Sequence, residues 1–518
     1  MLQDTFTKEL PQDPILGNTR RQVEKACYSF VSPKKTSNPV LLHVAVNMAD
    51  TLDLSKDFTA SEEFLKIVTG NKIVENSKPY AMCYGGHQFG NWAGQLGDGR
   101  AINLGEIVHN EKRWFLQLKG AGETPYSRTA DGLAVLRSSI REYLCSEAMF
   151  YLGVPTTRAL SLALTGDQVL RDVLYNGNQA FEKGAIVTRV APSFLRFGNF
   201  EIFSAREDVQ TLKTIVNYTL KYFYPHLEQN NKASYIQFFK EVAGRTLNMI
   251  IHWQRVGFVH GVMNTDNLSI LGLTIDYGPY GWLEGYDSGW TPNTTDRQHK
   301  RYRYGNQGNI GLWNLYQLAN ALYPLVEETA PLEAVLENYK NDFAVQYFDM
   351  MKSKVGLFSQ DKQDTQLLEQ LETTLQSTET DMTIFFRLLN SVSKDDDVAG
   401  AIVKIDFAFY TLEDLEGDIL LKWENWFTSY LKRLQKESLS DATRAEKMNA
   451  INPKYVLRNY MAQLAIDKAD EGDYALIDEL YTLLKNPYSE QASSEKWFAK
   501  RPEWARHKVG CSMLSCSS

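Results

Sequence analysis

Residues 260–267, which read HGVMNTDN, and the DYG triplet at residues 276–278 constrain this chain more than any other part of its sequence. They place Asp266 and Asn267 in one loop and a second aspartate, Asp276, shortly after it. Three hard oxygen donors within eleven positions suit Mg²⁺, which keeps several waters and shares phosphate oxygens with a nucleotide. The alternative is a polar turn before a strand, because the apolar run that follows this loop can be a buried β-hairpin.

The same loop departs from the protein-kinase pattern that it otherwise follows. Kinase catalytic loops read HRDLxxxN, with the aspartate as the base, and a DFG aspartate that holds the metal comes later. In this chain Val262 stands at the third position, where the base is expected. The sequence therefore predicts a site that binds a metal–nucleotide complex but lacks the usual group for activating a hydroxyl.

The segment before this loop has the order of elements of a kinase N-lobe. Residues 94–100 (GQLGDGR) form a glycine turn, and two strands with a polar hairpin between them are expected within residues 101–119. A helix is expected over residues 133–152, because leucine and isoleucine recur on one stripe. Lys119 ends the second strand and Glu142 lies on the helix, as in the pair that holds ATP phosphates in kinases. Spacing alone leaves open that these two side chains are exposed and never meet.

Other residues are weaker candidates for phosphate contacts. Gly97 and Gly99 leave the backbone free to approach phosphate oxygens, and Arg100 adds a fixed positive charge, although a plain hairpin would show the same glycines. Arg189 and Arg196 suit bidentate contacts with phosphate, yet arginines in a basic, aromatic stretch are usually surface residues.

Composition indicates a globular protein with a sizeable core, since 43% of the 518 residues are hydrophobic and 23% are charged. The net charge of −8 is mild and does not suggest a nucleic-acid partner. No apolar run approaches the roughly 20 residues that span a bilayer, and the first residues carry no basic-then-apolar signal. We therefore expect a cytoplasmic protein without a membrane partner. Five scattered cysteines do not suggest a disulfide framework.

From about residue 205 the pattern is mostly helical, with long amphipathic segments over residues 208–223 and 232–256 and further segments to about residue 486. The predicted fold class is α+β: a protein-kinase-like two-lobed fold with a mixed N-lobe and a large, mostly helical C-lobe with a C-terminal extension. The expected divisions are an N-terminal extension (1–80), an N-lobe with the glycine-rich loop, Lys119 and Glu142 (81–200), a C-lobe with the catalytic and metal-binding loops (201–330), and a helical C-terminal region with a cysteine-containing tail (331–518).

Several long strings of this sequence resemble the SelO (selenoprotein O, YdiU) family, which are protein adenylyltransferases with a pseudokinase fold. The resemblance runs over essentially the whole chain. Besides the two motifs above, the matching strings are YGGHQFG (84–90), QLGDGRA (95–101), QLKGAG (117–122), TPYSR (124–128), YGNQ (304–307) and NPKY (452–455).

The resemblance implies that ATP binds in a flipped orientation, with the γ-phosphate buried and the α-phosphate facing an acceptor hydroxyl. AMP would then be transferred with release of pyrophosphate. Asp266 would be the proton acceptor, which accounts for Val262, and Asn267 and Asp276 would bind Mg²⁺ or Mn²⁺. Glu142 would support Lys119 through an ion pair. For Asp131 and Gly132 a helix-starting turn is the alternative. The implied nucleotide contacts are Gly97, Gly99, Arg100, Lys119, Asp131, Gly132, Arg189, Arg196 and Asp276.

The implied partners are ATP, with UTP as an alternative donor, and proteins modified on Ser, Thr or Tyr hydroxyls, with self-modification as a further outcome. Many members have a cysteine or selenocysteine near the C-terminus, and Cys516 occupies that place here. Residues 277–300 contain no cysteine that could pair with it, so a disulfide to Cys511 is the option that is left open. Two other functions stay open. A kinase would move the γ-phosphate, against which Val262 counts, and a non-catalytic nucleotide-binding scaffold conflicts with the intact Lys119 and metal-ligand positions.

Overall fold

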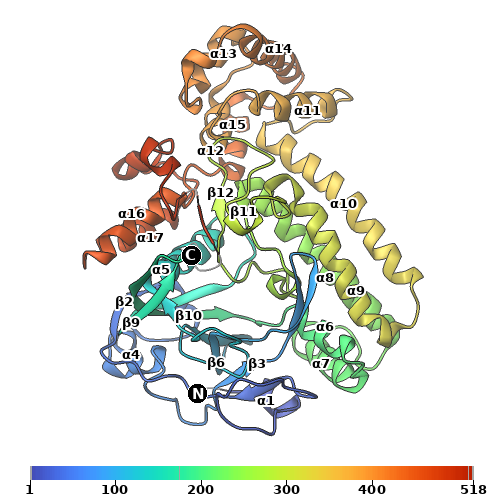
Figure 1. Ribbon diagram of the computed structural model, residues 1–518. Helices are drawn as coiled ribbons and strands as arrows, with labels where there is room; N and C mark the ends of the chain where they lie inside the picture. Colours follow the sequence, from blue (N-terminus) through green and yellow to red (C-terminus); the bar gives the residue numbers. More distant parts are fainter. Residues whose placement is uncertain (1–2, 174–175, 512, 516–518) are drawn as a thin grey trace.

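The structure is a computed structural model that describes residues 3–173, 176–511 and 513–515 (Figure 1). Its N-terminal part is built on one eight-stranded sheet, and the strand pairs within it are antiparallel. The path through the sheet is β1 (Tyr28–Phe30), β3 (Tyr80–Met82), β6 (Ala101–His109), β7 (Lys112–Lys119), β10 (Gln179–Ala191), β9 (Arg158–Asp172) and β2 (Val40–Val44), with β8 (Ala134–Val135) paired to β10.

The predicted hairpin after the glycine turn is confirmed as β6 and β7, which pair from Ala101 opposite Lys119 to His109 opposite Lys112. Each strand is buried over the part that is farther from the connecting turn. The long strands β9 and β10 were not predicted. They complete the centre of the sheet, and β10 lies directly beside β7.

The predicted helix over residues 133–152 is confirmed as α5 (Leu136–Tyr151), which packs on β9 and β10. Its first expected residues form β8 instead. Nearly all of its side chains are buried, because α16 (Asn459–Asp470) and α17 (Ala475–Leu484) cover it from the other side (Figure 1). Four short helices flank the sheet: α1 (Phe6–Glu9), α2 (Val46–Thr51), α3 (Lys56–Thr59) and α4 (Glu62–Val68).

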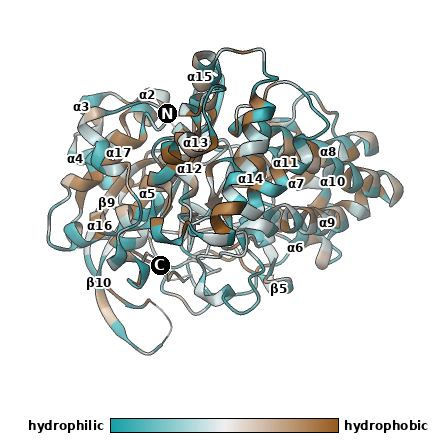
Figure 2. Ribbon diagram, turned by 90° about the horizontal axis from the view of Figure 1, so that it is seen from above, coloured by the Kyte–Doolittle hydropathy of each residue, from teal (hydrophilic) through white to brown (hydrophobic). Residues whose placement is uncertain are grey.

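The rest of the chain is mostly helical. Figure 2 shows that its helices carry both hydrophilic and hydrophobic residues, as amphipathic helices do. The helical pattern is interrupted after α11, because Asp381 caps a new helix by accepting from the backbone of Ile384. The remaining helices are α6 (Gly198–Ala205), α7 (Val209–Phe223), α8 (Lys232–Val256), α9 (Gln307–Val326), α10 (Ala330–Lys354), α11 (Asp364–Leu375), α12 (Met382–Leu388), α13 (Val398–Ile405), α14 (Gly417–Leu434) and α15 (Asp441–Ile451).

Two small two-stranded sheets are separate from the large one: the hairpin of β4 (Gly85–Gln88) and β5 (Asn91–Gln95), and the pair of β11 (Phe258–Val259) and β12 (Gly281–Trp282). The α+β class is therefore confirmed, with a sheet-containing N-terminal part and a large helical part. The limits of the four expected divisions stay a prediction. Over the described residues, none of the helices is both long and apolar enough to cross a membrane.

Candidate active site

The loop at residues 260–267 follows directly from α8 and β11. Helix α8 ends at Gly257, whose φ of 74° provides the left-handed turn that stops a helix. His260 is buried, and its Nε2 donates to the carbonyl of Ile275 at 2.9 Å, because that oxygen can only accept. Burial lowers the pKa of His260, so the ring is neutral in this site. The histidine therefore ties the loop to the residue just before Asp276.

The segment between these motifs is less regular than predicted. In place of a full β-hairpin, the structure has a single antiparallel bridge between Leu268 and Thr274. Ser269 forms a second bridge with Arg196, outside the segment. The segment nevertheless returns the chain on itself, so that Asp276 lies close to the loop that carries Asp266.

Asp276 is held by two arginines, one on β10 and one in the segment that follows β10. Arg189, on β10, places its Nη1 at 2.6 Å from Oδ1 of Asp276, and Arg196 donates to Oδ2. Burial would raise the pKa of Asp276, but the charges of Arg196 and Arg189, with Lys119 nearby, outweigh it and hold that pKa well below its usual range. Asp276 also has a φ of 59°, an uncommon backbone conformation for a residue other than glycine.

Lys119 and Glu142 meet. The Lys119 ammonium at the end of β7 lies 2.5 Å from Oε2 of Glu142 on α5, and only 12% and 3% of the two side chains are exposed. Glu142 also accepts from Arg189 at 3.2 Å, so one carboxylate serves two cations. Arg189 further donates to Gln117 at 2.5 Å. The strand β10 thus joins the lysine–glutamate pair to Asp276.

Asp266 lies in a 3₁₀ turn, η1 (Thr265–Asn267), and is buried. Its Oδ2 accepts from Gln88 at 3.3 Å, while its Oδ1 has no hydrogen-bond partner among the described residues. Burial raises the pKa of Asp266 to about 7, so this carboxyl can gain or lose a proton near neutral pH. Arg196 Nη1 donates to the Asp266 carbonyl at 2.8 Å as well as to Asp276, and so links the two aspartates.

The donors near Asp276 fit a divalent metal that is shared with phosphates. Asn267 donates through Nδ2 to the carbonyl of Val262 at 2.9 Å, which turns its amide oxygen away from that bond. Over the part of the chain that the structure describes, there is no group of three His, Cys, Asp or Glu side chains that would cage a metal. Mg²⁺ needs no such cage when one or two protein oxygens, waters and phosphates complete its shell.

The glycine turn has a packing reason that the sequence did not reveal. Gly97 has a φ of 97°, and a Cβ there would lie 2.4 Å from the Tyr126 ring. A Cβ on Gly99 would lie 2.8 Å from the Tyr126 carbonyl oxygen. Thr124 also donates to the carbonyl of Asp98 at 2.7 Å. The turn is therefore fixed against residues 124–128, while Arg100 beside it is exposed.

Asp131 and Gly132 belong to the loop that leads into β8 and α5. Asp131 accepts from both terminal nitrogens of Arg171 at 2.8 Å and from the backbone of Leu133 at 3.0 Å. Gly132 has a φ of 69°, and a Cβ on it would lie 2.2 Å from the backbone of Gly122. The alternative prediction, that Asp131 and Gly132 form the turn that starts the helix, is wrong. The N-cap of α5 is Val135.

Sequence reasoning missed three polar partners of this site. Gln117 accepts a hydrogen bond from Arg189, and Gln88 donates one to Asp266. Glu201 on α6 accepts a hydrogen bond from Thr265 at 2.5 Å. Two of them, Gln88 and Gln117, lie inside the strings YGGHQFG and QLKGAG that are quoted above. The sequence of such a string does not indicate which distant aspartate or arginine its glutamine contacts.

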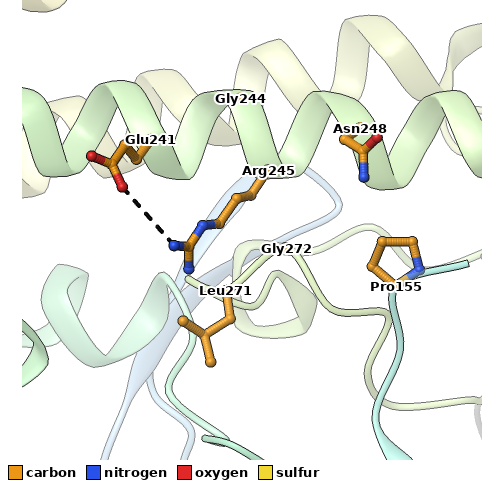
Figure 3. A pocket seen from close by; sticks show the side chains of 7 residues that line it. All are labelled: Pro155, Glu241, Gly244, Arg245, Asn248, Leu271 and Gly272. Atoms are coloured by element: carbon orange, nitrogen blue, oxygen red, sulfur yellow. Dashed lines mark ion pairs between the residues drawn. The ribbon is translucent and has the colours of Figure 1, made fainter. Parts of the chain in front are cut away.

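One surface pocket of about 350 Å³ contains none of the predicted site residues (Figure 3). Arg245 and Glu241, one turn apart on α8, form an ion pair at 3.9 Å along one side of it. Cys516 lies outside the described residues, so the predicted option of a bridge to Cys511 stays untested. Cys511 itself is buried, which raises the pKa of its thiol to about 12.

Comparison with known proteins identifies the family of this chain. The family model described as "Protein adenylyltransferase SelO" matches residues 18–485. A relative from Flavobacterium johnsoniae, named "Protein nucleotidyltransferase YdiU", is 62% identical over 100% of this chain and 99% of its own length. Relatives of the same name from Rhodopirellula baltica and Aromatoleum aromaticum are 52% and 51% identical, over 99% and 100% of this chain and 98% and 99% of theirs. Their class is that of nucleotidyltransferase enzymes. This chain belongs to the SelO family.

Proposed function

We propose that this protein transfers AMP from ATP to Ser, Thr or Tyr hydroxyls of other proteins and releases pyrophosphate, using a kinase-like two-lobed fold. Membership of the SelO family supports nucleotidyl transfer. The observation that carries the finer proposal is the double contact of Arg196, whose Nη1 bonds both the Asp266 carbonyl and the Asp276 carboxylate. It holds a base candidate next to a metal-ligand candidate, at a loop where Val262 replaces the kinase base.

Three cations converge on Asp276 and suit the phosphates of a nucleotide. Arg189 and Arg196 are buried, and only 12% of the Lys119 side chain is exposed. Fixed positive charges in a site of low dielectric stabilise the charge that develops on leaving pyrophosphate. Further nucleotide contacts are proposed from the glycine turn and the loop before α5: Gly97, Gly99, Arg100, Asp131 and Gly132.

Asn267 and Asp276 would hold Mg²⁺ or Mn²⁺, which supplies charge neutralisation at the phosphates when bound. Asp266 would receive the proton of the acceptor hydroxyl at its carboxylate. As the hydroxyl oxygen bonds to the α-phosphorus, the bond from that phosphorus to the bridging oxygen of pyrophosphate breaks. A pKa of about 7, raised by burial, matches this proton transfer at neutral pH.

The test is a parallel incubation of the full chain with a bacterial lysate, Mg²⁺ or Mn²⁺, and ATP labelled at either the α or the γ phosphate. Label from the α position alone is expected on protein, with Asp276→Ala as the inactive control. Label from the γ position alone would make the protein a kinase and overturn the proposal. If neither label appears on protein while the nucleotide still binds, the protein is a non-catalytic nucleotide-binding scaffold and the proposal fails. A matched incubation with α-labelled UTP compares UMP with AMP transfer, and labelled full chain reports self-modification.

A further inference from the structure

The β4–β5 hairpin lies against the loop that carries Asp266, although 178 positions separate the two in the sequence. Figure 2 places β5 at the edge of the molecule near α6, and contacts of β4 with both α6 and η1 agree with this. At Gly86 the two backbones come so close that a Cβ there would lie 3.0 Å from Cβ and Oδ1 of Asp266. The hairpin is thus part of the wall around this carboxylate.

The residues on either side of Gln88 are anchored to the loop. The His87 backbone donates to Thr265 Oγ1 at 2.7 Å, and the His87 ring contacts Glu201 at 3.0 Å. The Phe89 backbone donates to Asn264 Oδ1 at 3.1 Å. Thr265 in turn donates to Glu201. These bonds fix the backbone of Gln88 relative to the residues just before Asp266.

Gln88 itself makes an asymmetric contact with Asp266. Its Nε2 lies 3.3 Å from Oδ2, and Oδ1 is buried with no partner among the described residues. Arg196 holds the main chain of the same residue from the opposite direction, through its carbonyl. A carboxylate held at one oxygen and at its backbone has a defined orientation, and a positioned proton acceptor depends on that orientation.

We propose that Gln88 is a positioning residue, whose amide holds Oδ2 and thereby fixes the orientation in which the Asp266 carboxylate receives the proton of the acceptor hydroxyl. The inference rests on the proposed function, because it assigns Asp266 the role of proton acceptor. It adds a residue of the hairpin, far from the catalytic loop in sequence, to the machinery of transfer.

Gln88→Glu tests this, because it keeps the shape of the side chain and replaces the donating nitrogen by an oxygen. Asn91→Asp is the matched control, since it makes the same change in the same hairpin, where Asn91 is exposed and its Nδ2 contacts only the Phe89 carbonyl, at 3.4 Å, among the described residues. The measurement is the initial rate of α-label incorporation into lysate protein as a function of ATP concentration. Gln88→Ala and a thermal melt with ATP check that the fold and nucleotide binding survive.

We expect Gln88→Glu to lower the rate at saturating ATP by about tenfold to a hundredfold, with the KM for ATP within about twofold of the parent. Asn91→Asp should match the parent. In an Asp266→Asn background, Gln88→Glu should have little further effect, because the two residues act through one group. A parent-like saturating rate, or a loss seen only in KM, overturns the inference alone. A parent that transfers no α-label overturns the proposed function and this inference with it.

Discussion

Arg189 places its Nη1 at 2.6 Å from Oδ1 of Asp276, and the same nitrogen lies 3.2 Å from Glu142. A strand of the large sheet therefore joins the two acidic residues that the sequence assigns to different tasks, one to the metal and one to Lys119. The geometry makes each of these charges dependent on the others, and this dependence leads to specific expectations for variants.

Asp276→Ala should abolish metal-dependent nucleotide binding and transfer, because it removes a metal ligand. It should also reduce the free energy of unfolding by about 3–5 kcal/mol, because Arg189 and Arg196 are buried and lose a shared carboxylate. Thermal melts with and without MnATP, together with urea unfolding, measure both effects. A variant that MnATP stabilises as much as the parent would contradict the assignment of Asp276.

Asp266→Asn should bind nucleotide normally and transfer AMP about 10²- to 10⁴-fold more slowly, because it keeps the shape of the side chain but cannot accept a proton. The amide oxygen of the new asparagine can still accept the hydrogen bond from Gln88, so the surrounding structure is preserved. Nucleotide affinity and α-label incorporation should be measured on the same preparation. Transfer at the parent rate would refute the role of Asp266 as base.

Glu142→Gln should destabilise the fold more than Lys119→Met. Loss of the glutamate leaves the buried Lys119 without its ion-pair partner and takes one carboxylate from Arg189, at a cost of about 3–5 kcal/mol. Loss of the lysine leaves Glu142 paired with Arg189, so its cost should be smaller. Urea unfolding of both variants gives the order directly, and the reverse order would show that Lys119 is the residue that holds Glu142 in place.

The stability of the fold should depend on pH through Glu284, which lies after β12. Burial raises the pKa of Glu284 from 4.5 to about 7, although Arg458 and Arg501 act in the opposite direction. Since the folded protein holds this proton more tightly than the unfolded chain, stability is lost as pH rises from about 4.5 through 7, by about 3 kcal/mol in total. Glu284→Gln should remove this loss. In urea unfolding, the free energy of unfolding of Glu284→Gln relative to the parent should be higher at pH 8 than at pH 5. A difference between variant and parent that does not change with pH would contradict this role of Glu284.

Gly97→Ala should destabilise the glycine turn more than Gly94→Ala. Both glycines have positive φ, 97° and 71°, so both substitutions carry backbone strain of about 1 kcal/mol. Only at Gly97 would the new Cβ also collide with the Tyr126 ring, at 2.4 Å, whereas nothing lies within 4 Å at Gly94. Thermal melts compare the two variants. Equal losses would mean that Tyr126 moves aside without cost.

Local sequence patterns predicted the parts of this protein whose physical cause is local. The β6–β7 hairpin and α5 follow from apolar periodicity. Spacing left open whether Lys119 and Glu142 meet, and the ion pair that the structure shows was implied only by the resemblance to the SelO family. The strands β9 and β10 were missed, because their place in the sheet depends on pairing with distant strands. For the same reason Gln88 could not be connected with Asp266 from the sequence.

The double contact of Arg196 with the two aspartates has a consequence for how the site can be loaded. Both carboxylate oxygens of Asp276 accept from arginine, so a cation that binds Asp276 must share it with two guanidinium groups. A cation arriving alone would face electrostatic repulsion, whereas one arriving with a polyphosphate brings anions that satisfy the arginines. If Asp276 holds the metal as proposed, the site should favour a metal that arrives with the nucleotide over a metal that arrives alone.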